Sequence, residues 1–391
     1  MTNRIEMRYG CNPHQVAASC YMPDGARLPI RAVNDAPSYI NLMDALNSWQ
    51  LVSELRASIG LPAAASFKHV SPAGAAVGVG LDDTLRESLF VPDLELTPLA
   101  CAYARARGAD RVASYGDWIA LSDPVDVATA QLIRAEVSDG LIAPGFEEGS
   151  LEILRKKKGG SYRILEIDPD YTPVAEEVRD LYGLRLAQRR NEFVAQEDFL
   201  KNVVTARDEI SAAGKRDLIV ATIAVKYTQS NSVCLAVDGQ VIGSGAGQQS
   251  RVHCVRLAGG KADLWYLRQH PSVRGMRFAK GLKRPERDNA IDLFLQDDVS
   301  ENERDRWKKL FDEVPQPLSM DERRRWLNGL SGVALSSDAY FPFRDSIDRA
   351  SRSGVEYVVQ AGGSIMDRQV IEAADECGMV MVCSGVRLFH H

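Results

Sequence analysis

Short hydrophobic runs alternate along the chain with polar, turn-forming segments, as in proteins built from strands and helices. One run, at 63–67, ends in Lys68, and another, at 218–225, ends in Lys226; small or polar residues follow both. Short apolar runs bounded by turn residues are typical of buried strands, and small or polar residues often begin a helix. We therefore expect each of the two segments to form a strand, a loop and the start of a helix.

Two further pairs of similar segments follow in the same order. Residues 119–126 are similar to residues 333–345, because an apolar run in each precedes Ser, Asp and Pro, which suit a capped helix start. Residues 138–144 are similar to residues 352–359, where Gly ends a helix and a strand resumes. The repeated order predicts a duplicated α/β unit.

The length of the chain, 391 residues, suits two or three domains at roughly 100–200 residues each. We expect a first unit at 1–190 and a second unit at 191–391. The second unit has a longer interval between its matching segments, and residues at about 261–330 account for the difference. Acidic and basic residues alternate there with aliphatic and aromatic ones, which predicts an outer insertion of amphipathic helices without catalytic residues.

Composition and charge narrow the class of protein. Hydrophobic residues make up 45% of the chain, charged residues 26%, and the net charge is −6, which is typical of soluble enzymes and argues against a nucleic-acid partner. The sequence shows neither a signal peptide nor a membrane-spanning run, so we expect a cytoplasmic protein without a membrane partner. Seven cysteines without a Cys-x-x-Cys pair predict reduced thiols rather than disulfides or a zinc site.

The adjacent residues Lys68 and His69 are the first candidates for chemistry. An ammonium group lowers the proton affinity of a neighbouring imidazole, which then stays neutral and accepts a proton near pH 7. Such a pair alone is more often an ordinary surface feature. Because the sequence has no His-Glu-x-x-His, Gly-x-Ser-x-Gly or Walker motif, any catalysis should be acid–base and electrostatic.

Two other features could bind a ligand. The glycine-rich segment 243–251 has its third Gly too early for a dinucleotide loop, so we interpret it as a close backbone approach to a flat ligand. Arg8 and Arg387, near opposite ends of the chain, are candidates for holding a phosphate, although each alone also suits an ordinary surface arginine. The basic run 155–160 is typical of a solvated turn.

Seven segments form an ordered set of motifs. They are residues 8–15, 66–74, 138–145, 226–232, 245–251, 337–345 and 387–391. Together they closely resemble the transformylase half of the AICAR formyltransferase/IMP cyclohydrolase family, where AICAR is 5-aminoimidazole-4-carboxamide ribonucleotide. The resemblance covers almost the whole chain.

The resemblance implies a fold and an assembly. The fold would be two cytidine-deaminase-like α/β units without the deaminase zinc, and the assembly an intertwined homodimer with sites at the interface. Members of the family also carry an N-terminal cyclohydrolase domain. Because this chain starts almost at the first motif, it resembles a stand-alone transformylase, and a separate IMP cyclohydrolase would close the ring.

The resemblance also implies roles for individual residues. Lys68 and His69 would act on the amine of AICAR and the formyl group of the cosubstrate 10-formyltetrahydrofolate, with His69 as general base. Asn231 and Lys68 would stabilise the formyl oxyanion. The implied substrate-binding residues are Arg8, Tyr9, Asp139, Arg251, Asp338, Phe341 and Arg387. A structural potassium ion is implied near Thr228, Ser230, Ser232, Asp338 and Leu388, with no catalytic metal.

Two positions depart from the family pattern, and two other functions compete with formyl transfer. Ser346 and Ala361 stand where many family members have Asn and Pro, so the folate pocket is open to local differences. A non-catalytic nucleotide-binding paralogue would bind AICAR without transferring a formyl group. A deaminase-type hydrolase would contain zinc.

Overall fold

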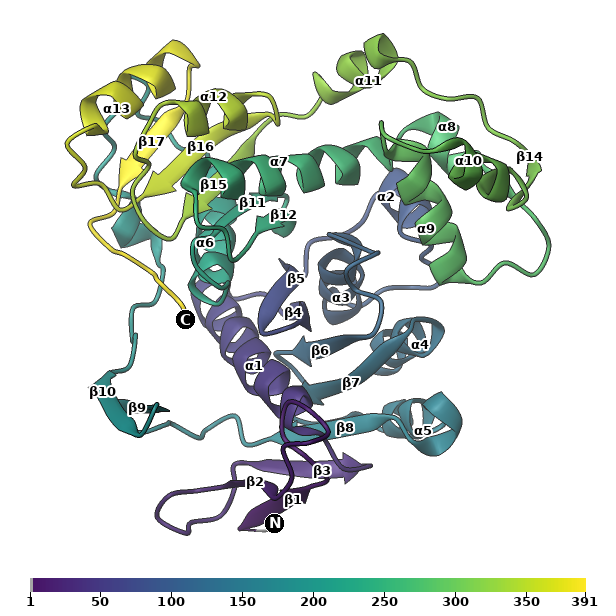
Figure 1. Cartoon of the computed structure of the whole chain (residues 1–391), viewed down its shortest axis with the longest axis vertical. Helices are drawn as coiled ribbons and strands as arrows, with labels where there is room; N and C mark the ends of the chain where they lie inside the picture. The colour runs from purple at the N-terminus through teal and green to yellow at the C-terminus, as the bar shows by residue number, and fades with distance from the viewer. Residues whose placement is uncertain (1–2) are drawn as a thin grey trace.

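Eleven strands from both halves of the chain form one continuous mixed sheet in the computed structural model, which describes residues 3–391 (Figure 1). Their order across the sheet is β17 (Val380–Cys383), β16 (Val355–Gln360), β15 (Val333–Ser337), β11 (Val233–Val237), β12 (Gln240–Gly245), β5 (Ser71–Val77), β4 (Ala63–Lys68), β6 (Asp117–Leu121), β7 (Ser138–Ala143), β8 (Arg163–Ile167) and β3 (Ile30–Asn34). This arrangement confirms the prediction of an α/β fold and shows that its sheet is mixed.

The two halves of the sheet have the same strand order and the same pairing directions. In the first half, β4 is antiparallel to β5 and β6, whereas β6, β7 and β8 are parallel. In the second half, β11 is antiparallel to β12 and β15, whereas β15, β16 and β17 are parallel. The halves meet where β12 pairs antiparallel with β5, and β3 adds an antiparallel edge beside β8.

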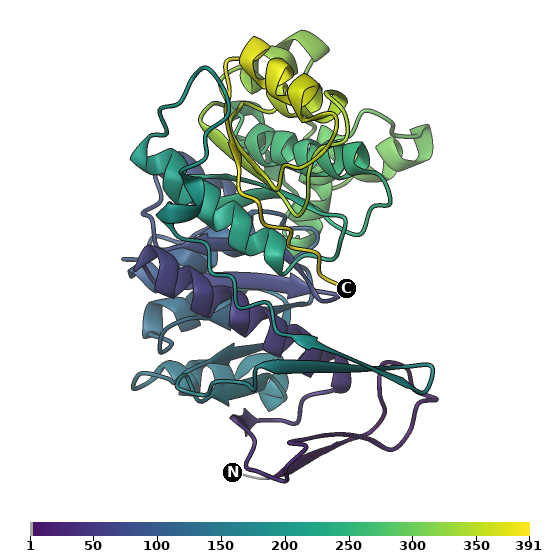
Figure 2. The same ribbon diagram turned by 90° about the vertical axis from the view of Figure 1, so that its left-hand side faces the viewer.

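Helices cover both faces of the sheet. On one face, α1 (Tyr39–Ile59) and α6 (Ala212–Lys226) lie side by side and share a core with Ala65 and Ala236 (Figure 2). On the other face, α3 (Pro98–Gly108) packs on Ala64, and α7 (Arg251–Leu267) packs on Leu235. Neighbouring residues of a strand point to opposite faces, which explains why these strands are apolar throughout. Outside the segment between α7 and β15, the remaining helices are α2 (Asp83–Ser88), α4 (Val127–Ala135), α5 (Ser150–Arg155), η1 (Lys157–Gly160), η2 (Glu197–Leu200), α12 (Asp345–Ser351) and α13 (Asp367–Glu376).

The predicted equivalence of the Lys68 and Lys226 segments is wrong. The first segment forms β4, but a second strand, β5, follows it rather than a helix, and residues 218–226 lie inside α6. Because α6 is buried almost all round, its apolar run lacks the helical period that distinguishes a surface helix from a strand. Lys226 is itself buried, where it pairs with Glu54 of α1 and donates a hydrogen bond to the Phe193 carbonyl oxygen at 2.7 Å.

The segment between α7 and β15 is largely helical. It contains α8 (Pro271–Arg274), β13 (Arg277–Phe278), α9 (Arg284–Leu295), α10 (Glu301–Lys308), β14 (Phe311–Glu313) and α11 (Met320–Leu327). Val273, Ile291 and Phe294 form a small core of its own. Within residues 3–391, no helix is both long enough and apolar enough to span a membrane.

Two short hairpins stand outside the main sheet. β1 (Arg4–Met7) pairs with β2 (Ala18–Tyr21), and β9 (Glu176–Leu181) pairs with β10 (Leu184–Arg189). All twelve residues of β9 and β10 are exposed, and the hairpin projects away from the body of the molecule (Figure 2).

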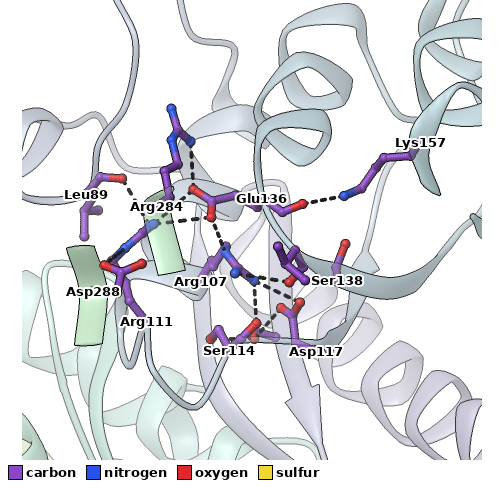
Figure 3. Close-up of polar contacts among 12 residues, drawn as sticks. Leu89, Arg107, Arg111, Ser114, Asp117, Glu136, Ser138, Lys157, Arg284 and Asp288 are labelled. Carbon is purple, nitrogen blue, oxygen red and sulfur yellow. Dashed lines mark hydrogen bonds and ion pairs between the residues drawn. The ribbon is translucent and has the colours of Figure 1, made fainter. Parts of the chain in front are cut away.

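A buried network of ion pairs fastens the helical segment to the first half of the sheet (Figure 3). Arg107 Nη1 lies 2.9 Å from Asp117 Oδ1, and Arg111 Nη2 lies 3.1 Å from Glu136 Oε1. From α9, Asp288 Oδ1 lies 2.8 Å from Arg111 Nε, and Arg284 also pairs with Glu136. Buried charges are tolerated only when they are paired in this way, so loss of one partner should be costly.

Replacement of Glu136 by Gln should lower the free energy of unfolding by about 3–5 kcal/mol at pH 7, because it removes the one carboxylate shared by Arg107, Arg111 and Arg284. Burial alone would raise the pKa of Glu136, but Arg111, Arg107 and Arg284 outweigh burial and lower it to about 2. The stabilisation is therefore complete above the unfolded-state pKa of about 4.3 and is lost as the pH falls toward 2.

Urea unfolding from pH 7 down to pH 3 measures this effect, with Glu152→Gln at an exposed site of α5 as control. The difference between Glu136→Gln and the original protein should shrink as the pH falls. A difference that stays constant with pH would contradict the assignment.

Candidate functional site

The tight turn between β4 and β5 presents the Lys68-His69 pair. His69 and Val70 form its two residues, with φ angles of 53° and 60°. Two successive positive φ angles define the hairpin turn whose twist matches that of the strands, although Val rarely adopts this conformation. The turn leaves His69 exposed, while Lys68 Nζ donates a hydrogen bond to the Tyr115 carbonyl oxygen at 2.7 Å.

Two carboxylates lie near this turn. Asp44 of α1 accepts a hydrogen bond from the Val70 N–H at 2.7 Å. Burial and the nearby charge of Asp139 raise the pKa of Asp44, whereas the Val70 hydrogen bond and the charge of His69 lower it. Burial is the largest effect, so the pKa of Asp44 is raised overall. Asp139, at the start of β7, pairs with Lys158 at 2.8 Å. The structure thus brings Lys68, His69 and Asp139 into one neighbourhood, together with Asp44.

A second group forms around the N-terminal end of α7. Arg251 is buried, where it pairs with Asp338 and donates a hydrogen bond to the Ser232 carbonyl oxygen at 2.9 Å. Its Nη2 also donates to Asn231 Oδ1 at 3.0 Å, and Asn231 Nδ2 donates to the Gln249 carbonyl oxygen at 3.2 Å. These bonds fix the orientation of the Asn231 amide.

The C-terminal segment packs against the second group. The Leu388 N–H donates a hydrogen bond to the Asp338 carbonyl oxygen at 2.8 Å, and the His390 N–H donates to Ser230 Oγ at 2.9 Å. Arg387 remains exposed, with its guanidinium over the ring of Phe389.

The residues of the implied potassium site also meet here. Asp338 Oδ2 accepts hydrogen bonds from Ser230 Oγ at 2.6 Å and from the Ser232 N–H at 3.0 Å. Thr228, two residues before Ser230, is also buried. Ser232 Oγ is buried and has no hydrogen-bond partner among residues 3–391. A buried oxygen without a partner fits a monovalent cation. Within residues 3–391, no group of three or more His, Cys, Asp and Glu side chains is placed to bind a metal ion.

One hydrogen bond joins the two groups. The Gln229 N–H donates to Ser71 Oγ at 3.2 Å. Ser71 is the first residue of β5, two positions after His69, and Gln229 is two positions before Asn231. The turn of the first half therefore lies beside the Asn231 segment of the second half.

Three predicted binding residues lie apart from these groups. Arg8 and Tyr9 follow β1 in the N-terminal hairpin, whose strands β1 and β2 lie at the opposite end of the molecule from β15–β17 (Figure 1). Phe341 is fully buried in the core beneath α7, and its N–H donates to Gln360 Oε1 at 2.8 Å. Its ring is therefore part of the hydrophobic core.

Sequence reasoning did not find several residues of this region. Tyr340 and Phe343 flank Phe341 and are 45% and 56% exposed, so they offer free rings where Phe341 does not. The sequence analysis also did not single out Asp44. Its position in an apolar helix, between the buried residues Leu42 and Ala45, could have indicated it. Ser346 is buried in α12.

The glycine-rich segment has a packing role that the interpretation as a ligand loop did not foresee. A Cβ atom at Gly243 would lie 2.1 Å from the Ala258 carbonyl oxygen, and one at Gly245 would lie 2.2 Å from the Cys254 carbonyl oxygen. These glycines therefore let α7 lie directly on β12. Gly74 does the same for α3 on β5, where a Cβ atom would lie 2.0 Å from the Ala106 carbonyl oxygen.

A cleft of about 1150 Å³ lies elsewhere. It runs along α7 toward α9, α11 and α12, and none of the predicted site residues lines it. Several of its charged groups are paired, as in Lys261 with Asp110 and Arg349 with Asp263, both at 2.9 Å. The two polar groups at the junction of the halves remain the better candidate site.

These features describe a mixed α/β protein with a polar site where its two halves join. The chain belongs to the AICARFT/IMPCHase bienzyme family, whose model matches residues 1–261. It is similar to proteins named "Bifunctional purine biosynthesis protein PurH": 32% identical to that of Magnetococcus marinus, 33% to that of Roseobacter denitrificans and 32% to that of Cereibacter sphaeroides. Each match covers 98% of this chain, which spans 59% of the length of each relative.

Proposed function

We propose that this chain transfers the formyl group of 10-formyltetrahydrofolate to the 5-amino group of AICAR, giving formyl-AICAR and tetrahydrofolate in purine biosynthesis. Family membership supports this reaction. The observation that carries it is the hydrogen bond between Gln229 and Ser71, which sets the segment of Asn231 beside the turn of Lys68 and His69.

The chemistry requires a base and an oxyanion partner. The AICAR amine is a poor nucleophile because its lone pair is delocalised into the ring, so a base must take its proton as it attacks the formyl carbon. His69 is exposed at the tip of its turn and can reach that proton. The attack leaves negative charge on the formyl oxygen, which Lys68 and Asn231 would stabilise, each by about 3 kcal/mol.

The other expected residues would hold the substrates. Arg8, Tyr9 and Arg387 are assigned to the ribonucleotide and its 5′-phosphate, and Arg251, Asp139, Asp338 and Phe341 to the walls of the nucleotide and folate pockets. The buried pairing of Arg251 with Asp338 favours an indirect role for both, in which they fix Asn231.

Replacement of His69 by Ala should lower the rate of formyl transfer by about 10²–10⁴-fold, because it removes the general base. The rate is measured from the change in absorbance as tetrahydrofolate forms. IMP cyclohydrolase is added to remove the other product, formyl-AICAR. His253→Ala, at an exposed position of α7, is the control. Unchanged turnover in His69→Ala would refute the assignment of the base, and AICAR binding by the original protein without any transfer would favour the non-catalytic paralogue.

We further propose a homodimer with sites at the interface. The β9–β10 hairpin exposes Leu181, Leu184 and Leu186, and a two-stranded hairpin alone is marginally stable in water. Exposed apolar groups of this kind mark interaction surfaces. Arg179 of this hairpin donates a hydrogen bond to the His391 carbonyl oxygen at 2.8 Å, so a second copy that covers the hairpin would lie near the C-terminal residues of the site.

The double change Leu181→Asp and Leu184→Asp should convert the dimer to a monomer, because it places charges in the proposed apolar contact. Light scattering after gel filtration measures the mass, and formyl transfer should fall with the loss of the dimer. Arg185→Ala on the same hairpin is the control, since its partner Asp180 is exposed. A double variant that remains dimeric would count against the hairpin as the contact.

A structural potassium ion near Thr228, Ser230, Ser232, Asp338 and Leu388 completes the proposed site. It would occupy the position next to Ser232 Oγ, which has no protein partner in the part of the chain that the structure describes. The ion would hold the Asn231 segment and the C-terminal segment together and take no part in the chemistry.

Potassium chloride should raise the melting temperature above that in choline chloride at equal ionic strength, because an ion that binds only the folded state stabilises it. Ser232→Ala should reduce this difference, whereas Ser58→Ala, which removes another buried hydroxyl without a partner, should not. Equal melting temperatures in both salts would exclude the ion.

A further inference from the structure

We propose that Asp44 is the positioning residue of this site: through its hydrogen bond to Val70 it holds the turn that presents His69 to the amine. This inference rests on the proposed formyl transfer and assigns a role to a residue outside the motif set described above.

The first observation is the conformation of the turn. Both His69 and Val70 have positive φ angles, and a β-branched residue such as Val70 is disfavoured there. A neighbouring group must therefore hold the turn. Asp44 does so, because its Oδ1 atom accepts the Val70 N–H at 2.7 Å. Disfavoured backbone conformations persist where surrounding contacts determine them, often at functional sites.

The second observation is that Asp44 sits on a rigid support. It lies near the start of α1, whose first turn is closed by reciprocal hydrogen bonds between Ser38 and Asn41. The same helix packs its buried residues Leu42 and Ala45 into the core beneath β4. Asp44 therefore has little freedom to move, and its hydrogen bond fixes the turn relative to the sheet.

The third observation is the distribution of charge around Asp44. Asp139 of β7 is already paired with Lys158, whereas Asp44 has no cationic partner in an ion pair within residues 3–391. Lys68 directs its ammonium group to the Tyr115 carbonyl oxygen. The hydrogen bond to Val70 is therefore the contact through which the half-buried Asp44 carboxylate acts on the turn.

The proton balance of the step is simple. The amine nitrogen of AICAR forms a bond to the formyl carbon, the C=O π electrons move onto the formyl oxygen, and the amine proton passes to the imidazole of His69. The C=O bond then re-forms as the bond from the formyl carbon to N10 of the folate breaks, and the proton on His69 passes to that nitrogen, giving tetrahydrofolate. Asp44 acts through the backbone of the turn and does not touch the substrate.

Two variants separate the roles of the hydrogen bond and the charge. Asp44→Asn keeps an oxygen that can accept the Val70 N–H but removes the charge, whereas Asp44→Ala removes both. Asp298→Asn, an exposed residue between α9 and α10, is the control. Hydrogen exchange of the Val70 amide in NMR spectra of the whole protein gives a readout independent of activity.

In Asp44→Ala, kcat should fall by about 10–100-fold, with the KM for AICAR within about twofold, because His69 is no longer held in position. The Val70 amide should also lose protection from hydrogen exchange. Asp44→Asn keeps the acceptor of the Val70 N–H and should retain most of both.

Full activity of Asp44→Ala would overturn the proposal, as would unchanged exchange of its Val70 amide. The exchange result stands even if the original protein transfers no formyl group. Lost protection with no transfer in the original protein would refute the proposed reaction while supporting the role of Asp44 in holding the turn.

Discussion

The antiparallel contact between β5 and β12 holds the molecule together. At this junction the Val77 N–H donates a hydrogen bond to the Gly239 carbonyl oxygen at 2.9 Å, and the fully buried side chain of Gln240 exchanges hydrogen bonds with Arg105. A buried amide with both of its ends satisfied defines one register, because a shift would leave polar groups unpaired. The position of Ser71 relative to Gln229 depends on that register.

Contacts on the two faces of the sheet keep the halves aligned. On one face, the buried pair of Lys226 with Glu54 ties α6 to α1. On the other, Gly74 and Gly245 let α3 and α7 lie directly on the two central strands. Each contact allows little adjustment. A shift at the first would leave a buried charge unpaired, and a side chain at either glycine would clash with the helix above it. The frame beneath the site is therefore rigid, as a site that depends on orientation requires.

The candidate site combines exposed and buried groups. His69 stands at the tip of an exposed turn, and Asn231 is held by a buried Arg251. The exposed aromatic rings of Tyr340 and Phe343 and the exposed Arg387 lie on the second half, whereas Arg8 and Tyr9 follow β1 on the first. The predicted binding residues are therefore spread over both halves of the chain.

The sequence by itself determined the α/β class, the ordered motif set and the Lys68-His69 pair, because apolar runs, turn residues and adjacent side chains are local features. It failed at 218–226, where a helix buried all round has no amphipathic period, and at Gly245, whose neighbour Cys254 comes close only when α7 lies on β12. It also could not reveal that Phe341 is a core residue. Only the tertiary structure placed Asp44 against Val70 and Gln229 against Ser71, because these contacts join distant segments whose separation is decided by how the helices and strands pack.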